Sequence, residues 1–366
     1  MSAKKLALIL PDFNGGGAER VMLTIARNVD RARFKPVLIV LQERGALRDL
    51  VPDDVTIICL KTRRLRRTLP MLIAALRRER PDIVLSTMAY MNFAVCFSTR
   101  LALGKKCRLV LREANMPSAT IARVKPAWLV RVLYRLLYPW ADTVVCNARP
   151  VADELRQVGV PDWTIHILPN PVDTDRIRFV AEVGECGDLV QVQDGGRLFV
   201  GIGRLIEQKG FDRLIEWFTA MPASDRLVIF GEGPLRRMLN DSIIRLGLKD
   251  RVLLAGFVKS PWACLKQADA FVMPSRWEGL PNAALEALAL GTPVIATSNT
   301  GGLPDIVNEV RNGMLVIADG KDEFVSAMGA VRPLGADGSR VSALPHRFAV
   351  SSVVMEYESV LDGVDG

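Results

Sequence analysis

The sequence predicts an α/β protein built from two Rossmann-like, doubly wound domains that face a central cleft. Its 366 residues are many for a single hydrophobic core, so two domains are the default expectation. In each half, short apolar strand patterns alternate with helical patterns, which implies a parallel sheet covered by helices on both faces. Between the halves, residues 170–197 lack periodicity and carry Asn-Pro at the start and Gly-Gly near the end, which is typical of a junction.

The strands are expected where short runs of apolar and β-branched residues lie between polar or glycine-containing segments. In the first half these runs are Leu6–Leu10, Pro36–Leu41, Thr56–Cys59, Ile83–Ser86, Arg108–Leu111, Thr143–Cys146 and Ile165–Leu168. In the second half they are Leu198–Ile202, Arg226–Phe230, Val252–Leu254, Ala270–Met273, Pro293–Ala296 and Gly313–Ile317. Helical spacing occurs at Ala18–Asn28, Leu69–Arg80, Pro126–Tyr138, Gly210–Met221, Pro234–Leu246 and Asn282–Leu290.

We place the N-terminal domain at residues 1–175 and the C-terminal domain at residues 176–345. Residues 346–366 carry apolar side chains at helical spacing, and we expect this helix to return to the N-terminal domain. Residues 337–341, just before it, are expected to form an irregular loop.

The net charge of +8 is distributed unevenly along the chain. The excess of Lys and Arg lies before about residue 178, and the remainder is net acidic. Only the first half is therefore expected to meet an anionic surface or substrate, and nucleic acid or an anionic membrane satisfies that charge.

The six cysteines are scattered and form no C-x-x-C pair, and with only two histidines a Cys/His zinc site is not expected. We expect buried free thiols in a reducing cytosol. The apolar run Leu6–Leu10 is too short for the core of a signal peptide. No stretch reaches the roughly 18 apolar residues of a membrane-spanning helix, so a cytoplasmic protein is expected.

A glycine-rich loop, "PDFNGGGAER", follows the first strand. Gly15, Gly16 and Gly17 precede a helix, so the backbone can approach a phosphate and the helix amino end supplies N–H groups. The loop lacks the G-x-G-x-x-G pattern of nicotinamide dinucleotide sites. A plain flexible turn is the alternative.

The corresponding loop of the second half, "VGIGRLIEQKGFDRL", contains Arg204 and Lys209 between a strand and a helix. Two cations at this spacing can both point at one diphosphate, Arg as a planar fork and Lys as a mobile charge. The alternative is that both are solvated.

The stretch "SRWEGLPNAALEALALGTPVIA" contains two glutamates around a helix start. Pro281 suits the first helical position, so a helix begins near Asn282. Glu286 lies on an otherwise apolar helix, so its carboxylate is either paired internally or bonded to ligand hydroxyls. Glu278 lies just ahead of the helix, so both glutamates can reach one ligand.

These motifs carry a family resemblance. Glu-x7-Glu in "EGLPNAALE", followed by "GTPVIA" and combined with "GRLIEQKG", resembles the retaining GT-B glycosyltransferases of family 4. "GGGAE", "LPNPVD", "GEGPLR", "LAGFV" and "GGLPD" also occur in the family's order, from about Leu6 to Ile317. Any one motif is weak, whereas the ordered set is highly specific. The resemblance implies the GT-B architecture and retaining, metal-independent transfer from a nucleotide-sugar, with UDP favoured over GDP.

The resemblance also implies roles for individual residues. Arg204 and Lys209 would neutralise the diphosphate as it departs, Glu286 would bond the ribose hydroxyls, and Glu278 would lie near the sugar and phosphate. The other residues expected at the donor are Phe257, beside the nucleobase, and the backbone of Gly16, Gly17, Gly203, Gly279, Leu280, Pro281 and Asn282. Asp173-Thr174-Asp175 is a D-x-D sequence of the kind that binds Mn²⁺ in metal-dependent transferases, but we expect a turn there rather than a metal site.

The chain departs from the family near the acceptor. Many relatives carry a histidine after the strand that corresponds to Arg108–Leu111, whereas this chain has "LREANMP". Members that act on lipid-linked sugars can carry such a pattern. We expect Glu113 to orient the acceptor hydroxyl, Arg112 to bind a phosphate and Asn115 to lie near the acceptor; a salt-bridged strand end is the alternative.

Two basic segments bear on the acceptor. "KTRRLRRTLPMLIAALRRER" begins at Lys61, and "VKPAWLVRVLYRLLYPW" ends at Trp140. Basic and aromatic residues around an apolar stripe suit a helix on an anionic membrane. The alternatives are a solvated face for the first and an ordinary packing helix for the second. We expect peripheral binding to the inner face of the cytoplasmic membrane, a polyprenyl-diphosphate-linked sugar as acceptor, and no nucleic acid.

Two other functions remain open. A sugar-nucleotide epimerase can share this architecture, but it leaves the basic aromatic segments unexplained. A non-enzymatic binder of anionic surfaces leaves the two cations and two glutamates of the second half without a role.

Overall fold

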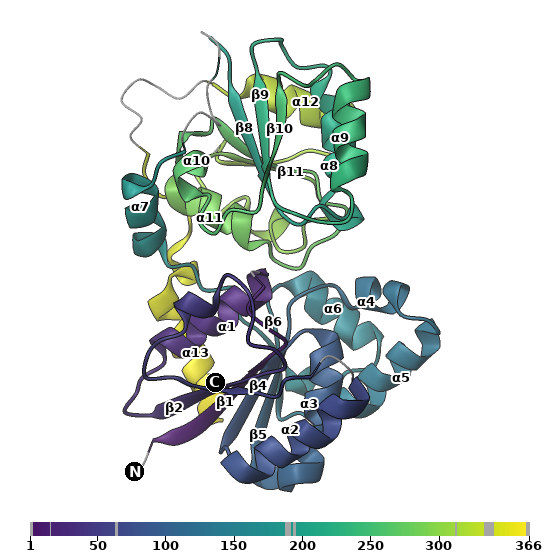
Figure 1. Cartoon of the computed structure of the whole chain (residues 1–366), viewed down its shortest axis with the longest axis vertical. Coiled ribbons are helices and arrows are strands. Elements are labelled where there is room, and N and C mark those ends of the chain that lie inside the picture. Colours follow the sequence, from purple (N-terminus) through teal and green to yellow (C-terminus); the bar gives the residue numbers. More distant parts are fainter. Residues whose placement is uncertain are drawn as a thin grey trace. The chain divides into compact units, whose positions relative to one another are not determined.

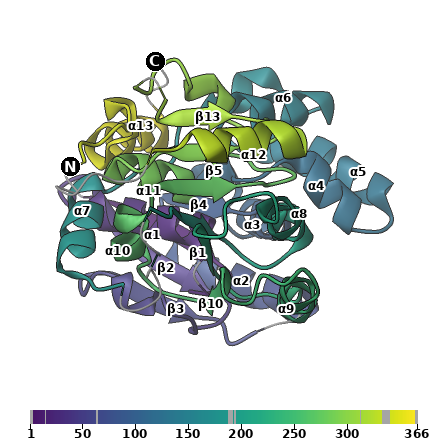
Figure 2. The same cartoon turned by 90° about the horizontal axis from the view of Figure 1, so that it is seen from above.

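The computed structural model describes residues 3–14, 16–62, 65–186, 192, 195–311, 313–332 and 340–363. The chain divides into two compact units, Met1–Pro171 with Val350–Gly366 and Val172–Ala349. Figures 1 and 2 show that each unit has a sheet with helices on both faces. The boundaries that we expected from the sequence, after residues 175 and 345, differ slightly from those of the structure.

The first unit contains a parallel sheet in the order β3-β2-β1-β4-β5-β6-β7. Its strands are β1 (Lys4–Leu10), β2 (Phe34–Val40), β3 (Thr56–Cys59), β4 (Ile83–Thr87), β5 (Arg108–Glu113), β6 (Thr143–Cys146) and β7 (Ile165–Ile167). Its α-helices are α1 (Gly17–Asn28), α2 (Leu65–Glu79), α3 (Ala89–Leu103), α4 (Pro117–Arg123), α5 (Ala127–Leu137), α6 (Arg149–Gln157) and α13 (Val350–Asp362). Strand order turns between β1 and β4, which is the topological switch point at which such sheets bind ligands.

The C-terminal helix α13 is part of the first unit. Val353, Val354 and Tyr357 belong to the same buried cluster as alternate residues of β1 and the inner face of α1. Glu358 accepts from the Asp30 amide at 2.7 Å and from Arg33 Nη1 at 2.6 Å. The helix is therefore fixed both by apolar packing and by a carboxylate at its inner edge.

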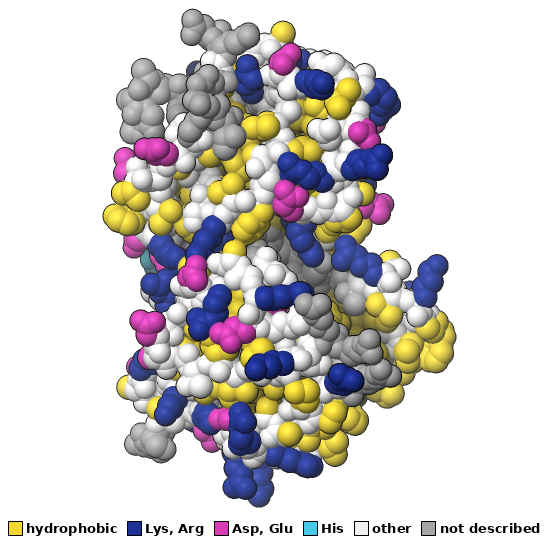
Figure 3. Space-filling model, in the orientation of Figure 1, with side chains coloured by type: hydrophobic (Ala, Val, Ile, Leu, Met, Phe, Trp, Pro, Cys, Tyr) yellow, Lys and Arg dark blue, Asp and Glu magenta, His cyan; other side chains and the backbone are white. Residues whose placement is uncertain are grey.

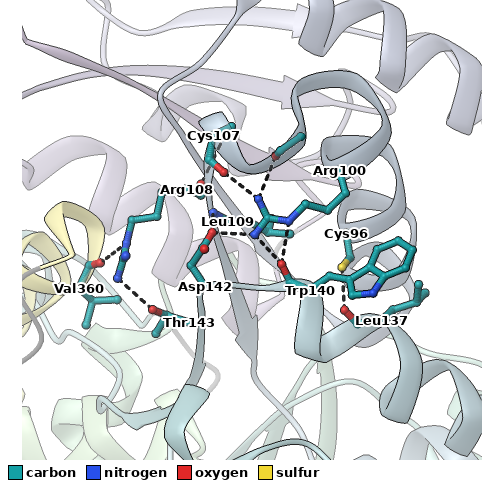
Figure 4. Close-up of polar contacts among 11 residues, drawn as sticks. Cys96, Arg100, Cys107, Arg108, Leu109, Leu137, Trp140, Asp142, Thr143 and Val360 are labelled. Carbon is teal, nitrogen blue, oxygen red and sulfur yellow. Dashed lines mark hydrogen bonds and ion pairs between the residues drawn. The ribbon is translucent and has the colours of Figure 1, made fainter.

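Two arginines, Arg100 in α3 and Arg108 at the start of β5, make further hydrogen bonds within the first unit, as Figure 4 shows. Arg108 Nε donates to the Val360 carbonyl of α13 at 2.8 Å. Arg100 joins α3 to the segment that leads into β6, because it donates to the Trp140 carbonyl at 2.7 Å and pairs with Asp142 at 2.7 Å. These contacts lie at the amino-terminal ends of the strands, away from the edge at which ligands bind.

The second unit contains a parallel sheet in the order β10-β9-β8-β11-β12-β13. Its strands are β8 (Leu198–Ile202), β9 (Arg226–Phe230), β10 (Val252–Gly256), β11 (Ala270–Met273), β12 (Val294–Ala296) and β13 (Leu315–Ile317). Its α-helices are α7 (Thr174–Val183), α8 (Phe211–Phe218), α9 (Arg236–Arg245), α10 (Trp262–Gln267), α11 (Asn282–Leu290) and α12 (Gly320–Ala330). A short 3-10 turn, Glu207–Lys209, links β8 to α8.

Every strand that the sequence predicted is confirmed, with ends shifted by no more than about two residues. The expected helices are present too, but α3, α4, α6, α7, α10 and α12 were not predicted. Helix α7 lies inside the segment that we took for an aperiodic junction, where Asp173 caps it by accepting from the Arg176 amide at 3.2 Å. Residues 187–191, 193 and 194 of that segment, and residues 337–339 of the expected loop, lie outside the described residues.

The expectation of free cysteines is wrong for one pair. Cys186 and Cys264 form a disulfide that joins the segment after α7 to α10. The contact depends on tertiary packing of α7 against α10, and 78 residues separate the two cysteines in sequence, so no local pattern announces it. Cys59, Cys96, Cys107 and Cys146 are free thiols, and burial raises the pKa of the Cys96 and Cys107 thiols to about 12.

Within the described part of the chain, no helix combines the length and apolar character needed to cross a membrane.

Candidate active site

Two loops meet at the carboxyl ends of β8 and β11 in the second unit. One carries Lys209 and the other carries Glu278, and the Lys209 ammonium lies 2.6 Å from Glu278 Oε1. The two side chains are 17% and 9% exposed, so this pair is largely shielded from water. The structure thus brings together two residues, 69 positions apart, that the sequence assigned to one ligand.

Glu278 has two further hydrogen-bond donors. Ser275 donates its hydroxyl to Oε1 at 2.9 Å, and the Gln208 side chain donates to Oε2 at 3.3 Å. Gln208 also donates to the Trp277 carbonyl at 3.0 Å. A buried carboxylate is stable when it is paired and hydrogen-bonded in this way, and its orientation is then fixed.

A second set of contacts fastens the Glu278 loop to α8. Arg276 forms a two-point ion pair with Asp212, at 2.8 and 2.6 Å, and Arg213 donates to the Pro274 carbonyl at 2.9 Å. Burial alone would raise the pKa of Asp212, but the hydrogen bonds from Arg276 outweigh it and hold that pKa below its ordinary value. Such bidentate pairs fix geometry, so the loop that carries Glu278 is held in one position against α8.

Two glycines allow close backbone approach in this region. A Cβ on Gly203 would lie 3.0 Å from Lys209 Cδ and Cε, so the absence of a side chain lets the Lys209 stem cross the loop. Gly301 has a φ of +59°, and a Cβ there would lie 1.7 Å from the Gly279 carbonyl oxygen. Gly302 N donates to that same carbonyl at 2.8 Å. The "SNTGGLPD" loop therefore supports the backbone immediately before α11.

The amino end of α11 follows directly after this loop. The helix begins at Asn282, as the sequence predicted, and Pro281 is its N-cap rather than its first helical residue. The backbone from Gly279 to Asn282 thus leads into a helix amino terminus, a group of N–H donors suited to an anion. Glu286, a turn inside the helix, accepts from the Trp262 indole Nε1 at 2.7 Å.

The remaining donor-side residues lie in the same unit. Arg204 is exposed on the loop that also carries Lys209, and in the described residues its side chain has no hydrogen-bond or ion-pair partner. Phe257 is 47% exposed in the connection between β10 and α10. Both side chains are accessible to a ligand, and both belong to the residues that we expected at the donor. Their roles there stay predictions.

In the first unit, Gly16 caps α1 and Gly17 begins it, whereas Gly15 lies outside the described residues. The Glu19 carboxylate lies against Gly16, because a Cβ on that glycine would lie 2.2 Å from Glu19 Oε2. An anion bound at Gly16 would have this carboxylate as a neighbour. This unfavourable electrostatic contribution from Glu19 was not predicted from the sequence.

The structure does not support the acceptor roles that we expected for Arg112 and Glu113. Arg112 is 1% exposed and donates to the Tyr357 hydroxyl at 3.2 Å and the Thr87 hydroxyl at 3.2 Å, and its Nη2 to Asn170 Oδ1. It therefore ties β5 to α13 inside the unit. Its guanidinium has no surface that a phosphate could reach.

Glu113 points to the opposite face of β5, since successive strand residues alternate. It is 1% exposed, and Oε2 accepts from the Tyr138 hydroxyl at 2.5 Å and the Tyr134 hydroxyl at 3.4 Å. Burial raises its pKa to about 7 despite the hydrogen bonds from the two tyrosines. The alternative of a salt bridge between Arg112 and Glu113 is wrong as well, because the two side chains diverge.

Asn115 lies in the loop after β5, half-buried, with Oδ1 accepting from the Met116 amide at 2.9 Å. Of the three expected acceptor residues, it is the one at a partly accessible position. A role at the acceptor remains a prediction for it.

The Asp173-Thr174-Asp175 sequence begins a helix rather than a turn, and Asp173 acts as its cap. Across the described residues, no group of three or more His, Cys, Asp or Glu side chains is placed to hold a metal ion.

Comparison with known proteins identifies the family. The model for Glycosyltransferase Family 4 matches residues 15–176, and the model for Glycosyl transferases group 1 matches residues 190–331. This chain belongs to the family 4 glycosyltransferases. Its two parallel sheets with alternating helices are the two Rossmann-like domains of the GT-B architecture.

Two relatives align with this glycosyltransferase over most of its length. The first, from Campylobacter jejuni, is described as N-acetylgalactosamine-N,N'-diacetylbacillosaminyl-diphospho-undecaprenol 4-alpha-N-acetylgalactosaminyltransferase. It is 26% identical over 345 residues, 89% of each chain. UDP-Gal:alpha-D-GlcNAc-diphosphoundecaprenol alpha-1,3-galactosyltransferase of Escherichia coli is 26% identical over 85% of this chain and 84% of its own.

Solved structures share the fold at lower identity. HepE of Anabaena in complex with UDP-glucose superposes with a TM-score of 0.79, covering 98% of this glycosyltransferase and 100% of HepE at 17% identity. WaaG, a glycosyltransferase involved in lipopolysaccharide biosynthesis, superposes with a TM-score of 0.71 at 15% identity, over 98% of this chain and 100% of WaaG. At these identities the likeness establishes the fold.

Sequence reasoning missed three side chains near the site: Gln208, Ser275 and Trp262. Gln208 and Ser275 lie inside the quoted motifs, and the available signal was a polar residue directly before Lys209 and another three residues before Glu278. Trp262 lies 24 residues before Glu286 and has no motif around it.

Proposed function

We propose that this glycosyltransferase moves a sugar, with retention of anomeric configuration, from a nucleotide-sugar to a polyprenyl-diphosphate-linked sugar. The Lys209–Glu278 pair beside the amino end of α11 is the observation that carries the donor side. A lysine held in a shielded position and a helix amino terminus can together stabilise the negative charge of a departing diphosphate.

In this proposal Lys209 is shared between Glu278 and the diphosphate, while exposed Arg204 adds a second cation. Glu286 accepts from ribose hydroxyls and Phe257 lies against the base. Because Arg204, Lys209 and the helix end supply the electrostatic stabilisation, we propose that no metal ion is required. Retention is proposed from the resemblance to retaining members of the family.

The names of the relatives support a lipid-linked acceptor and a UDP-sugar donor. Two relatives that align over 85% or more of the chain are described as acting on sugars linked to undecaprenol through a diphosphate, and one of them is described with UDP-Gal. HepE was solved with UDP-glucose. We therefore propose the class of acceptor. We do not propose which sugar is transferred or which sugar receives it.

We further propose that the surface of α5 binds an anionic membrane. Helix α5 buries Val130 and Tyr134 and turns a second apolar face outward, with Trp128 64% and Leu136 60% exposed. Exposed Arg131 and Arg135 lie on the same helix. Figure 3 shows hydrophobic side chains gathered at this edge of the unit, where α5 lies. Tryptophan and leucine flanked by arginine are the composition of an interfacial helix.

The other basic segment, which begins at Lys61 and contains α2, does not expose an apolar face of this kind in its described residues. On α2, Leu72 and Leu76 are buried, and the arginines Arg77 and Arg78 are exposed. Its apolar stripe is thus occupied by core packing, and its cations form a solvated face. Residues 63 and 64 of that segment, and the side chains of 65 and 66, lie outside the described residues.

Peripheral attachment at the inner face of the cytoplasmic membrane completes the proposal. The Cys186–Cys264 disulfide is an observation against this location, because disulfides are rare in reducing compartments. Alkylation of the protein in intact cells, followed by mass analysis, gives the redox state of this pair. A fully oxidised pair in the cell contradicts the cytoplasmic location.

The test of the proposed reaction is a transfer assay. The protein is incubated with UDP- and GDP-sugars, with and without a polyprenyl-diphosphate-linked sugar and with EDTA, and product masses and anomeric configuration are measured. We expect acceptor-dependent transfer with retention that EDTA leaves unchanged. Conversion of the donor to its epimer without an acceptor supports the epimerase instead, and absence of any conversion contradicts both enzymes.

A further inference from the structure

Trp262 is 4% exposed at the first position of α10, and its indole N–H donates to Glu286 Oε2 at 2.7 Å. We propose that Trp262 is a positioning residue for the donor: it holds the Glu286 carboxylate in the orientation that accepts a ribose hydroxyl. The inference rests on the proposed function, in which Glu286 contacts the nucleoside.

The chemistry of the two groups favours a directed contact. An indole has a single N–H donor and no acceptor, so a buried tryptophan satisfies it with one well-placed oxygen. A hydrogen bond to a carboxylate is charge-assisted and shorter than one between neutral groups. One oxygen of Glu286 is thereby fixed, and rotation of the carboxylate is restricted.

Helix α11 offers Glu286 little help of its own. Its residues on either side are Ala and Leu, and Leu285, Ala287 and Leu288 are buried. The helical neighbours of Glu286 include no cation. Helix α10, a different element, supplies the indole N–H that donates to Glu286.

Helix α10 is firmly attached to its surroundings. Cys264 forms the disulfide with Cys186, the Thr292 hydroxyl donates to the Leu265 carbonyl at 2.8 Å, and Lys266 pairs with Glu182. Two of these attachments come from α7 and the residues just after it, and the third comes from Thr292, just after α11. Trp262 is consequently a donor on a fixed element, which a positioning residue requires.

The connection that leads into α10 also carries Phe257, which the proposed function puts beside the nucleobase. Trp262 thus joins the segment that would contact the base to the helix that would contact the ribose. Its loss should weaken recognition of the nucleoside and leave the departing diphosphate, held at Lys209, unaffected.

The experiment compares Trp262→Phe, which keeps an aromatic ring and removes the N–H, with wild type. Dissociation constants for UDP and GDP are measured by calorimetry, and kcat and KM by the transfer assay. We expect the nucleotide that wild type prefers to bind about tenfold more weakly, which corresponds to loss of one hydrogen bond to a charged group. We expect kcat at saturating donor to change less than about twofold.

Trp217→Phe is the matched control, because Trp217 is a buried tryptophan of α8 in the same unit. This variant should bind the nucleotide as wild type does.

Two further variants separate orientation from packing. In a Glu286→Ala background, Trp262→Phe should cause no additional loss of affinity, because the two residues act through one contact. Trp262→His keeps a ring N–H and should bind more tightly than Trp262→Phe, whereas a packing role predicts the reverse. Thermal melting of each variant shows that it is folded.

If folded Trp262→Phe binds the preferred nucleotide as tightly as wild type does, the inference is overturned. It is also overturned if Trp262→Phe weakens nucleotide binding as much in the Glu286→Ala background as it does in wild type. Those results leave the proposed function standing. Failure of wild type to bind either UDP or GDP is a different result, which overturns the proposed function and this inference with it.

Discussion

The Lys209 ammonium lies 2.6 Å from Glu278 Oε1, and the two side chains are only 17% and 9% exposed. The cation is held in place by a carboxylate that also accepts from Ser275 and Gln208. A diphosphate that arrives at α11 would therefore meet a lysine whose position is already set.

Replacement of Lys209 by methionine should lower kcat by about 10²–10³-fold, because a positioned charge at the leaving group is lost. The steady-state transfer rate at saturating donor measures it. Lys266→Met is the matched control, since Lys266 also forms an ion pair, with Glu182, on the same unit. A Lys209→Met enzyme that is folded and within twofold of wild type contradicts the assignment of this site.

Glu113→Gln should change how stability depends on pH. The pKa of Glu113 is raised from its ordinary value of 4.5 to about 7, so the folded chain holds a proton that the unfolded chain has released between those pH values. The contribution of Glu113 to the stability of wild type is fully present below about pH 4.5 and is lost as pH rises through about 7. As pH rises from about 4.5 to about 7, the free energy of unfolding of the variant should increase by about 3 kcal/mol relative to that of wild type. Urea melts from pH 4 to 8 measure it, and parallel curves for the two proteins contradict it.

Reduction of the Cys186–Cys264 disulfide should destabilise the second unit. Closing a loop of this length typically contributes about 2–4 kcal/mol to the free energy of unfolding. Cys186→Ser should therefore unfold at lower urea than wild type without reductant and match it with dithiothreitol present. Cys59→Ser, which removes a free thiol, is the control. Wild-type melts that reductant leaves unchanged contradict the prediction.

Membrane binding should depend on the exposed apolar face of α5. Trp128→Ser combined with Leu136→Ser removes two side chains that are each worth about 1.5–3 kcal/mol when buried in an apolar phase. Binding to vesicles rich in anionic lipid should fall at least tenfold, as measured by flotation. Salt should weaken the binding of wild type.

Trp163→Ser is the control for that experiment. Trp163 is 73% exposed in the same unit but lies outside the basic helix. Equal loss of binding in this variant, or no binding by wild type at any salt concentration, contradicts the proposed membrane surface.

The positions of the strands and the order of the loops followed from local patterns. Runs such as Leu227–Phe230 and Ala270–Met273 are apolar along their whole length, as buried parallel strands are, so the local pattern alone indicated these strands. Pro281 likewise marked the start of α11 by its missing N–H. Helices α4 and α6 were missed because they are short and only partly apolar, and α7 because the surrounding residues read as a junction.

The sequence by itself determined the two parallel sheets and the motifs of the family, because strand patterns, turn residues and motif spacing are local properties. Tertiary structure decided which charged groups are accessible. It buried Arg112 against Tyr357 and Glu113 against Tyr138, and it left the apolar face of α5 exposed while covering that of α2. It also joined Cys186 to Cys264 and Trp262 to Glu286. Burial and pairing arise when distant segments pack together, and no spacing along the chain encodes which segments will do so.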